Sequence, residues 1–248
     1  NEASPVGSEA LFHLGEALER TGKREDALKA YEQVVQRAGK FENDPWPEKG
    51  GAQLVRFLRP RLEAALKADD DFELINLFHR NGPFADRLYA GTELLLKVAE
   101  AHRRLGFPIE SARLFQSLIR DSKAEAFHEV ALMGLGDSYL EQKDMRAARA
   151  VFERYRLQFP VGRFAGQALI GLLTSFEGEG NTSGLVKLGK QWLIHNPRHP
   201  DRALVQLKVA DALRQAKRDA EAAPLYESVL KAGMDLSALD RLRYADVL

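Results

Sequence analysis

The stretch AFHEVALMGLGDSYLEQKDMRAARAVFERYRLQFP, residues 126–160, decides the fold of this chain. Gly136 lies inside an amphipathic helical pattern, and Ala99, Ala210 and Ala245 sit in similar patterns elsewhere. Taken in chain order as Ala99, Gly136, Ala210 and Ala245, these small residues are separated by 37, 74 (twice 37) and 35 residues. A period of that length over a helical pattern predicts stacked helix pairs, and such a solenoid is first of all a binding surface.

The first helix pair is predicted for residues 8–39. Thr21–Lys23 breaks the helical pattern and separates the two helices. Apolar residues at offsets of three and four give each helix one buried face. The small Gly15 and Ala27 would let the two backbones approach closely. The first helix contributes Leu11, Leu14, Gly15 and Leu18 to this face, and the second contributes Ala27, Tyr31 and Val34.

Four segments carry residues by which the chain resembles the tetratricopeptide repeat family. The resemblance implies an all-α fold, a right-handed superhelical α-solenoid of helix–turn–helix repeats with about six helix pairs and a truncated last helix. It also implies a protein-binding role. The matching residues are Leu14-Gly15, Leu18, Gly22, Ala27 and Tyr31; Val98-Ala99, Ser111, Phe115 and Leu118; Leu132, Leu135-Gly136, Tyr139, Ala148, Phe152, Tyr155 and Pro160; and Val209-Ala210, Leu213, Ala222, Tyr226 and Val229.

On this resemblance, the whole chain is expected to form a single solenoid over residues 1–248. Most of the length divides into repeats, one of them degenerate, and one segment diverges from the pattern. The predicted parts are repeats at 8–39, 84–122, 126–160 and 200–233, a degenerate repeat at 163–197, an insertion and divergent helix pair at 40–82, and a truncated first helix at 236–248.

The divergent segment opens with a flexible insertion at Asn43–Pro47. Helical patterns follow at 51–67 and 71–80, and Pro60 is expected to kink the first helix or mark a boundary. The acidic run Asp69–Asp71 fits a cap and a favourable charge at the start of the second helix. A divergent helix pair is therefore expected here.

The joints between later repeats carry a second resemblance. Phe159–Gly162 and Asn196–Asp201 each follow a second helix and lead into an Ala-rich first helix, as in bacterial envelope tetratricopeptide proteins such as the outer-membrane assembly lipoprotein and Tol–Pal coordinator families. The degenerate repeat also contains a Gly-rich turn at 177–184, which we expect to be long. This likeness favours a periplasmic or cell-envelope location over the cytoplasm. We expect the chain to be a piece of a longer protein, with a targeting signal or further repeats outside it.

Composition excludes several classes of function. Lys plus Arg and Asp plus Glu both number 36, so the net charge is +0 and no global field attracts nucleic acid or an anionic membrane. The absence of Cys excludes disulfides, thiolate metal sites and Cys nucleophiles. No apolar run approaches the roughly 18 residues of a membrane span. The basic cluster Arg56, Arg59 and Arg61 is interpreted as a solvated face, so no nucleic-acid partner is expected.

The candidate chemical groups do not assemble into a recognisable site. His195 and His199 have the spacing of a helical zinc pair, but Pro197 and Pro200 disrupt that helix. His128 lies near two Glu residues without a further ligand, and His102 is expected to be exposed or to face the groove. The glycines at 178, 180 and 184 lack the Lys-Ser/Thr of a phosphate loop. We therefore expect no catalytic residue, no cofactor and no metal, and the chain is not expected to be an enzyme.

In the family, the first helix of each pair lines a concave groove. The residue after each small packing residue is then expected to face that groove, and so is the residue three before it. One hypothesis is that this surface binds a basic-amphipathic peptide or protein segment; the alternative is that the apolar row packs between helices and the acids are solvated. The acids are Glu16, Glu100, Asp137, Asp211 and Asp246, with Thr174 in the degenerate repeat, and the apolar row is Phe12, Leu96, Met133, Leu207 and Leu242, with Ile170.

The sequence thus predicts a protein–protein interaction or scaffolding module within a larger bacterial envelope-associated protein. A cytosolic regulatory module detached from its effector domain is one alternative. Self-association is another, because the chain ends at Leu248 inside a helix and uncapped solenoids tend to associate. The helices lack the Lys/Asn/Arg set with which co-chaperone members of the family clamp an acidic C-terminus, which disfavours a chaperone-tail receptor.

Overall fold

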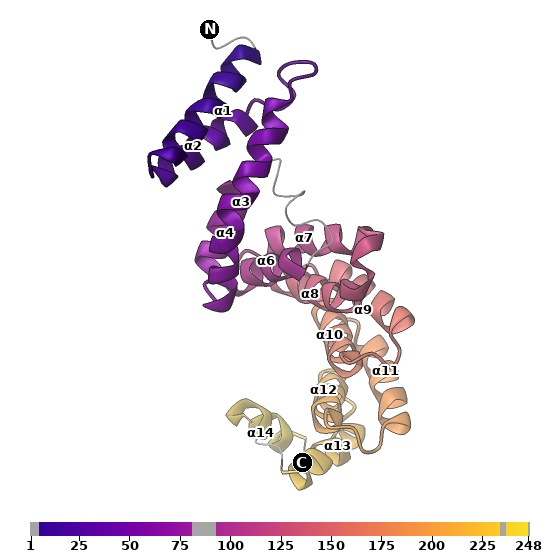
Figure 1. Ribbon diagram of the computed structural model, residues 1–248. Helices are drawn as coiled ribbons and strands as arrows, with labels where there is room; N and C mark the ends of the chain where they lie inside the picture. The colour runs from indigo at the N-terminus through magenta and orange to yellow at the C-terminus, as the bar shows by residue number, and fades with distance from the viewer. Residues whose placement is uncertain (1–4, 81–92, 234–236, 248) are drawn as a thin grey trace. The chain divides into compact units, whose positions relative to one another are not determined.

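The computed structural model describes residues 5–80, 93–233 and 237–247, and within these ranges its regular structure is entirely helical (Figure 1). The chain divides into two compact units, Asn1–Phe127 and His128–Leu248. In each unit, helices joined by short turns pack on their neighbours in chain order. This arrangement confirms the predicted all-α solenoid of helix pairs. That all repeats form one continuous domain stays a prediction.

The first unit contains three helix pairs, and the middle one corresponds to the divergent segment. Successive helices contact one another from α1 to α4, and α4 packs on α6. The predicted repeat at 84–122 begins outside the described residues. The helices are α1 (Pro5–Arg20), α2 (Arg24–Val35), α3 (Trp46–Lys67), α4 (Asp71–Arg80), α6 (Glu93–Arg104) and α7 (Pro108–Arg120), followed by the 3-10 segment η2 (Ser122–Phe127).

The second unit contains three further pairs and a last helix. Within this unit, α10 and α12 each pack on the second helix of their own pair and on that of the preceding pair. Residues 236 and 248, the predicted limits of the truncated helix, lie outside the described residues. The helices are α8 (His128–Glu141), α9 (Met145–Gln158), α10 (Ala165–Gly178), α11 (Thr182–His195), α12 (Arg202–Gln215), α13 (Asp219–Lys231) and α14 (Ala238–Ala245).

A left-handed turn residue recurs with the repeat period. Gly106, Lys143, Gly180 and Lys217 follow one another at intervals of 37 and have φ between 57° and 81°. The amide after each bonds back to the fifth residue before it, for example Asn181 N–H to the Phe176 carbonyl at 2.8 Å. This is the Schellman way of ending a helix, which satisfies its last carbonyls and starts the next helix within three residues.

The turn of the degenerate repeat is therefore shorter than its composition suggests. We expected a long loop over 177–184, but α10 continues to Gly178 and α11 begins at Thr182. Asn181 caps α11, because its side-chain oxygen accepts a hydrogen bond from Gly184 N–H at 2.9 Å. The expectation was wrong because the number of glycines indicates only how many conformations the turn could adopt. The left-handed Gly180 and the Asn181 cap hold the turn between α10 and α11 in one short conformation.

Aromatic side chains of second helices fill the space above the small residues of first helices. A Cβ on Gly136 would lie 2.5 Å from the Phe152 ring, and a Cβ on Gly171 would also meet that ring. Gly15 likewise leaves room for Tyr31, whose ring would be 2.6 Å from an added Cβ. One ring on α9 thus packs against the bare backbones of both α8 and α10, which confirms the close approach predicted from the small residues.

The divergent helix pair has the predicted helices with one difference. The second, α4, has the predicted bounds, and Asp70 caps it by accepting a hydrogen bond from Glu73 N–H at 3.0 Å. The first, α3, begins at Trp46 and runs through Pro60 without a break. Pro60 lies on the exposed side, where water can satisfy the carbonyl that loses its N–H partner.

Gly171→Ala is expected to destabilise the second unit by about 1–3 kcal/mol, because the added methyl must displace the Phe152 ring. The loss should appear although alanine is the better helix former by roughly 1 kcal/mol. Urea unfolding followed by circular dichroism measures the change. Gln167→Ala, an exposed position on the same helix, is the control and should alter stability little. Equal midpoints for both variants would show that the ring does not need the bare backbone.

Candidate functional site

The apolar row expected to line the groove is mostly buried. Phe12, Leu96, Met133 and Leu207 are at most 9% exposed, whereas Leu242 on α14 is 60% exposed. Phe12, for example, packs against the second helix of its own pair, with its ring centre 5.6 Å from that of Tyr31. The four buried side chains pack between helices and expose little apolar surface, and a role of this row in binding a partner stays a prediction.

The acids of the same predicted groove have different surroundings. Glu16 bonds His13 at 2.9 Å, and Glu100 lies 3.3 Å from the Lys97 amine. Asp137 is half-buried and Asp246 is exposed. A role for these acids in binding a partner remains a prediction.

Asp211 is more enclosed than Glu16 and Glu100. It accepts hydrogen bonds from the Tyr226 hydroxyl at 2.6 Å and from Arg243 at 2.9 Å. Burial and the neighbouring carboxylate raise the pKa of Tyr226, so its hydroxyl remains a donor at neutral pH. The charge of Asp211 is thus used within the chain, tying α12 to α13 and α14.

A cleft of about 830 Å³ opens in the first unit between α3, the turn that follows it, α4 and α6. Its floor is apolar. Leu62 and Leu74 are buried in the packing of α3 and α4, whereas Leu66 and Leu94 are half-buried and present part of their surface to the cleft. The volume lies within the range of roughly 300–1,000 Å³ that is typical of ligand clefts, and the apolar floor provides the anchor.

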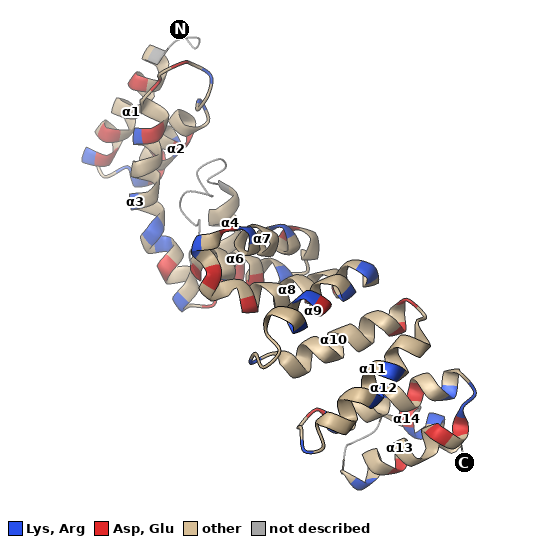
Figure 2. Cartoon of the chain, turned by 90° about the vertical axis from the view of Figure 1, so that its right-hand side faces the viewer, with Lys and Arg blue, Asp and Glu red and all other residues tan. Residues whose placement is uncertain are grey.

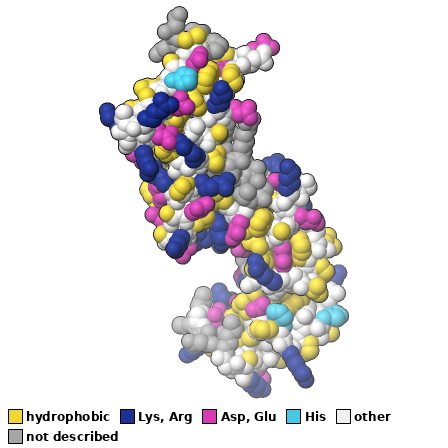
Figure 3. All heavy atoms as spheres, viewed as in Figure 1, with side chains coloured by type: hydrophobic (Ala, Val, Ile, Leu, Met, Phe, Trp, Pro, Cys, Tyr) yellow, Lys and Arg dark blue, Asp and Glu magenta, His cyan; other side chains and the backbone are white. Residues whose placement is uncertain are grey.

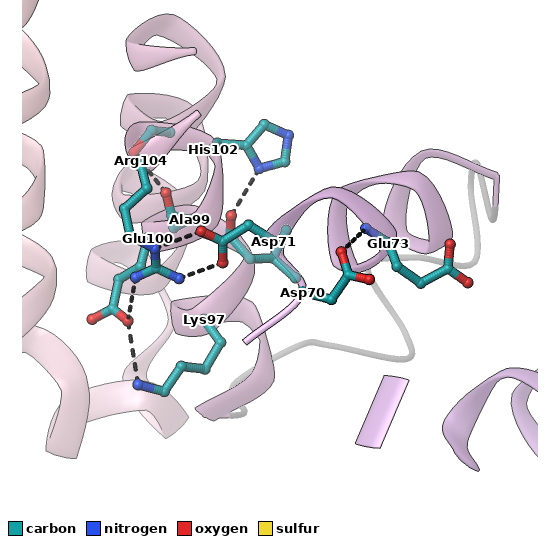
Figure 4. Close-up of polar contacts among 10 residues, drawn as sticks. Asp70, Asp71, Glu73, Lys97, Ala99, Glu100, His102 and Arg104 are labelled. Carbon is teal, nitrogen blue, oxygen red and sulfur yellow. Dashed lines mark hydrogen bonds and ion pairs between the residues drawn. The ribbon is translucent and has the colours of Figure 1, made fainter. Parts of the chain in front are cut away.

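One wall of the cleft is held by a bidentate ion pair between α4 and α6. The Arg104 guanidinium donates to the two Asp71 carboxylate oxygens, with Nε–O and Nη–O distances of 2.7 and 2.6 Å. Figure 4 shows Arg104 between Asp71 and Glu100, with Lys97 on the far side of Glu100. The hydrogen bonds from Arg104 lower the pKa of Asp71, so this carboxylate stays ionised and the pair stays closed at neutral pH.

Other charges on the rim have no ion-pair partner within the described chain. Glu63, Asp69 and Glu93 are the acids, and Arg59 and Lys67 are the cations. Arg59, Glu63 and Lys67 are spaced by four on α3 and so lie along one side of that helix. The cleft therefore combines an apolar floor with charged groups that are free to contact a partner.

His102 is buried behind this wall, contrary to the expectation that it would be exposed or face the groove. It is 1% exposed, and its Nδ1 donates to the Val98 carbonyl at 2.8 Å. Its Nε2 lies 3.1 Å from His79 Nε2, so the two rings join α6 to α4. The sequence contained the signal that was missed, because position 102 follows Val98 and Ala99 by four and three and shares their buried face.

The other histidines have local roles. His195 Nδ1 bonds the Gln191 carbonyl at 2.8 Å, and His199 Nδ1 accepts from Asp201 N–H at 3.1 Å. Over the described ranges, no group of three or more His, Asp or Glu side chains is arranged to hold a metal ion. None of the described helices is both long and apolar enough to cross a membrane.

Family models for the tetratricopeptide repeat match residues 8–41, 96–162 and 191–237, together more than half of the chain. The chain belongs to the tetratricopeptide repeat family. Repeats of this family generally mediate protein–protein interaction, and proteins built from them are typically non-catalytic scaffolds. No curated protein sequence matches the chain.

One solved structure shows the same fold at low sequence identity. A tetratricopeptide repeat protein from Parabacteroides merdae is 14% identical, with a TM-score of 0.50 over 98% of this chain and 86% of that one. A point variant of a putative kinesin light chain from Podosopora anserina, with nearly identical TPR-like repeats, is 15% identical, with a TM-score of 0.48 over 92% and 94%. Likeness at this level of identity concerns the fold alone.

Acidification below about pH 6.5 is expected to destabilise the first unit through His102. Burial lowers the pKa of the folded histidine below 6.5, and His79 lowers it further, whereas the Val98 bond and Glu110 act in the opposite direction. The unfolded chain therefore binds more protons in this window. Stability is fully present above pH 6.5 and is lost as the pH falls towards the pKa of the folded state.

The slope of unfolding free energy against pH between about pH 5 and 7.5 measures this effect, with His102→Gln compared to the native chain. The slope should be smaller in the variant. His195→Gln, which removes an exposed histidine, is the control and should keep the native slope. An unchanged slope in His102→Gln would assign the acid sensitivity to other groups.

Proposed function

We propose that this chain is a protein–protein interaction module that binds a segment of its partner in the cleft between α3, α4 and α6. The observation that supports this most directly is the 830 Å³ cleft itself, with half-buried leucines on its floor and charges without ion-pair partners on its rim. An amphipathic helix or an extended segment binds such a surface through apolar anchors and edge contacts.

The charge of the rim favours a basic-amphipathic segment. Glu63, Asp69 and Glu93 offer three acids without an internal ion pair, against two such cations, Arg59 and Lys67. Lys or Arg side chains of a bound segment would neutralise the acids, and the two cations on α3 would fix its direction by repelling its basic residues. The partner chemistry is that inferred from the sequence, but the proposed site is this cleft rather than the row of acids and apolar residues predicted along the first helices.

The cellular setting belongs to the same proposal. The likeness of the repeat joints to envelope proteins supports a scaffold within a larger, envelope-associated bacterial protein, with a detached cytosolic regulatory module as the alternative. Self-association is a second candidate, favoured by Leu242, which is 60% exposed on the last helix. Molar mass measured against concentration distinguishes it, because Leu242→Ser should abolish any dimer that this helix forms.

Two labelled peptides of the same length and the same leucine positions test the cleft, one with lysine and the other with glutamate at the remaining helical positions. Fluorescence anisotropy is expected to show tighter binding of the lysine peptide. That affinity should fall as salt rises to about 0.5 M, because ions screen exposed charge pairs. Equal affinity for both peptides would contradict the assigned partner chemistry.

Variants locate the binding. Leu66→Asn with Leu94→Asn should weaken the lysine peptide about tenfold or more, since both leucines present apolar surface to the cleft. Glu63→Lys with Glu93→Lys should shift the preference towards the glutamate peptide. Leu14→Asn is the matched control and should bind as the native chain does, because Leu14 is 49% exposed on α1, outside the cleft, and not buried as its spacing had suggested. Undiminished binding by the cleft variants would place the site elsewhere.

A further inference from the structure

Three aliphatic side chains of the second unit are almost fully exposed. Leu157 in the last turn of α9 is 84% exposed, Val161 in the following joint is 95% exposed, and Ile194 in the last turn of α11 is 75% exposed. Leu157 and Ile194 are 37 residues apart and so occupy the same position in successive repeats. A single exposed aliphatic residue is ordinary on a protein surface. An exposed aliphatic residue at the same position of two successive repeats, with Val161 close to the first in sequence, indicates a binding surface.

Cations share the outward face of these two helices. Arg146 and Arg154 on α9 are eight residues apart, and Arg154 precedes Leu157 by three, so all three lie on one side of the helix. Lys187 precedes Ile194 by seven, which places both on one side of α11, and Arg198 follows Ile194 by four in the next joint. All four cations are exposed, and none has an ion pair within the described chain.

One acid shares this face. Glu153 lies four residues before Leu157 and seven after Arg146, and it is paired within α9 with Arg149, whose guanidinium lies 3.7 Å away. The described helix α11 contains no acid at all. Figure 2 shows Lys and Arg on both helices, and Figure 3 shows hydrophobic side chains beside basic ones at the surface of this unit. A chain of net charge +0 thus has a locally cationic surface with bare aliphatic groups.

The shape of this surface favours one kind of occupant. Both helices pack on α10, and Leu157, Val161 and Ile194 line none of the three cavities that stand out among the described residues. A folded partner would need a separate pocket for each protruding side chain. A fluid bilayer accepts separate aliphatic groups without preformed pockets, and its anionic headgroups complement the cations between them.

We propose that the outer face of α9 and α11, defined by the three aliphatic and four basic side chains above, binds the surface of an anionic lipid bilayer. Leu157, Val161 and Ile194 enter the headgroup region, and the arginines and the lysine lie against lipid phosphates. The binding is peripheral, through the surface of a folded repeat array. It is independent of the cleft in the first unit.

Vesicle co-sedimentation of the whole chain tests the proposal, with phosphatidylcholine vesicles that contain either no anionic lipid or about 30 mol% phosphatidylglycerol. The chain is expected to sediment with the anionic vesicles and not with the neutral ones. Raising salt to about 0.5 M should release most of it, because the attraction is screened. Failure to bind anionic vesicles at low salt overturns the proposal.

Two sets of substitutions on the face separate its two components. Leu157→Ser with Val161→Ser and Ile194→Ser is expected to reduce vesicle binding about tenfold or more. Arg154→Gln with Lys187→Gln and Arg198→Gln should do the same and remove the salt dependence. All six side chains are exposed, so folding should be preserved, and thermal unfolding by circular dichroism verifies it.

Matched controls lie elsewhere on the chain. Phe72→Ser removes a 76% exposed aromatic ring that stands between two acids on α4, and Lys29→Gln with Lys231→Gln removes two exposed lysines. Both should bind vesicles as the native chain does. Equal loss in controls and face variants would mean non-specific adsorption and overturn the proposal.

The same variants distinguish the other occupants. If the chain ignores vesicles but binds the glutamate peptide, and the face variants lose that peptide, the surface docks an acidic protein segment and the lipid proposal is overturned. Cleft variants that lose the lysine peptide while they retain vesicle binding show that the two sites are separate. The lipid proposal then stands whether or not the cleft is confirmed.

Discussion

The stack of helix pairs depends on an aromatic ring that meets bare backbone on two sides. Phe152 of α9 packs against Gly136 of α8 and Gly171 of α10, and at neither position is there room for a Cβ. The ring therefore fixes how close α8 and α10 come to α9. Because the left-handed turn recurs every 37 residues, the same relation between helices is propagated from pair to pair. Residues that differ between repeats and take no part in this packing are then available to form binding sites.

Regular stacking has a consequence for the inner surface that the sequence pattern alone did not show. Successive first helices come close enough for side chains of one to pair with those of the next, as Glu19 does with Arg56, Glu177 with Lys208 and Asp211 with Arg243. Acids that look available in sequence are thereby neutralised within the chain. The open cleft lies instead at the divergent pair, where the 22-residue α3 departs from the repeat length and α6 packs on α4.

Sequence reasoning predicted the local features and missed those that depend on contacts between repeats. The helix pairs, the small packing residues and the Asp70 cap all follow from residue types at short spacing, and the structure contains them. The burial of His102 was missed because a polar residue was weighed by its type rather than by its place beside Val98. The cleft was missed because much of its lining comes from the divergent segment, where the 22-residue α3 carries no repeat signature from which its facing positions could be assigned.

In a repeat protein, the net charge says little about how charges are distributed over the surface. The chain sums to +0, yet many acids pair across helices or edge the cleft, whereas on the outward side of α9 and α11 four cations without an ion-pair partner face one acid, Glu153, which pairs with Arg149. Arg149 and Lys190 show the division, since each reaches an acid of a neighbouring element while Arg154 and Lys187 on the same helices reach none. Because the helical period places each residue on one side of its helix, a neutral chain can have an acid-edged cleft and, elsewhere, a surface rich in cations. Composition averages over them, and only the placement of each charge relative to the packed face separates them.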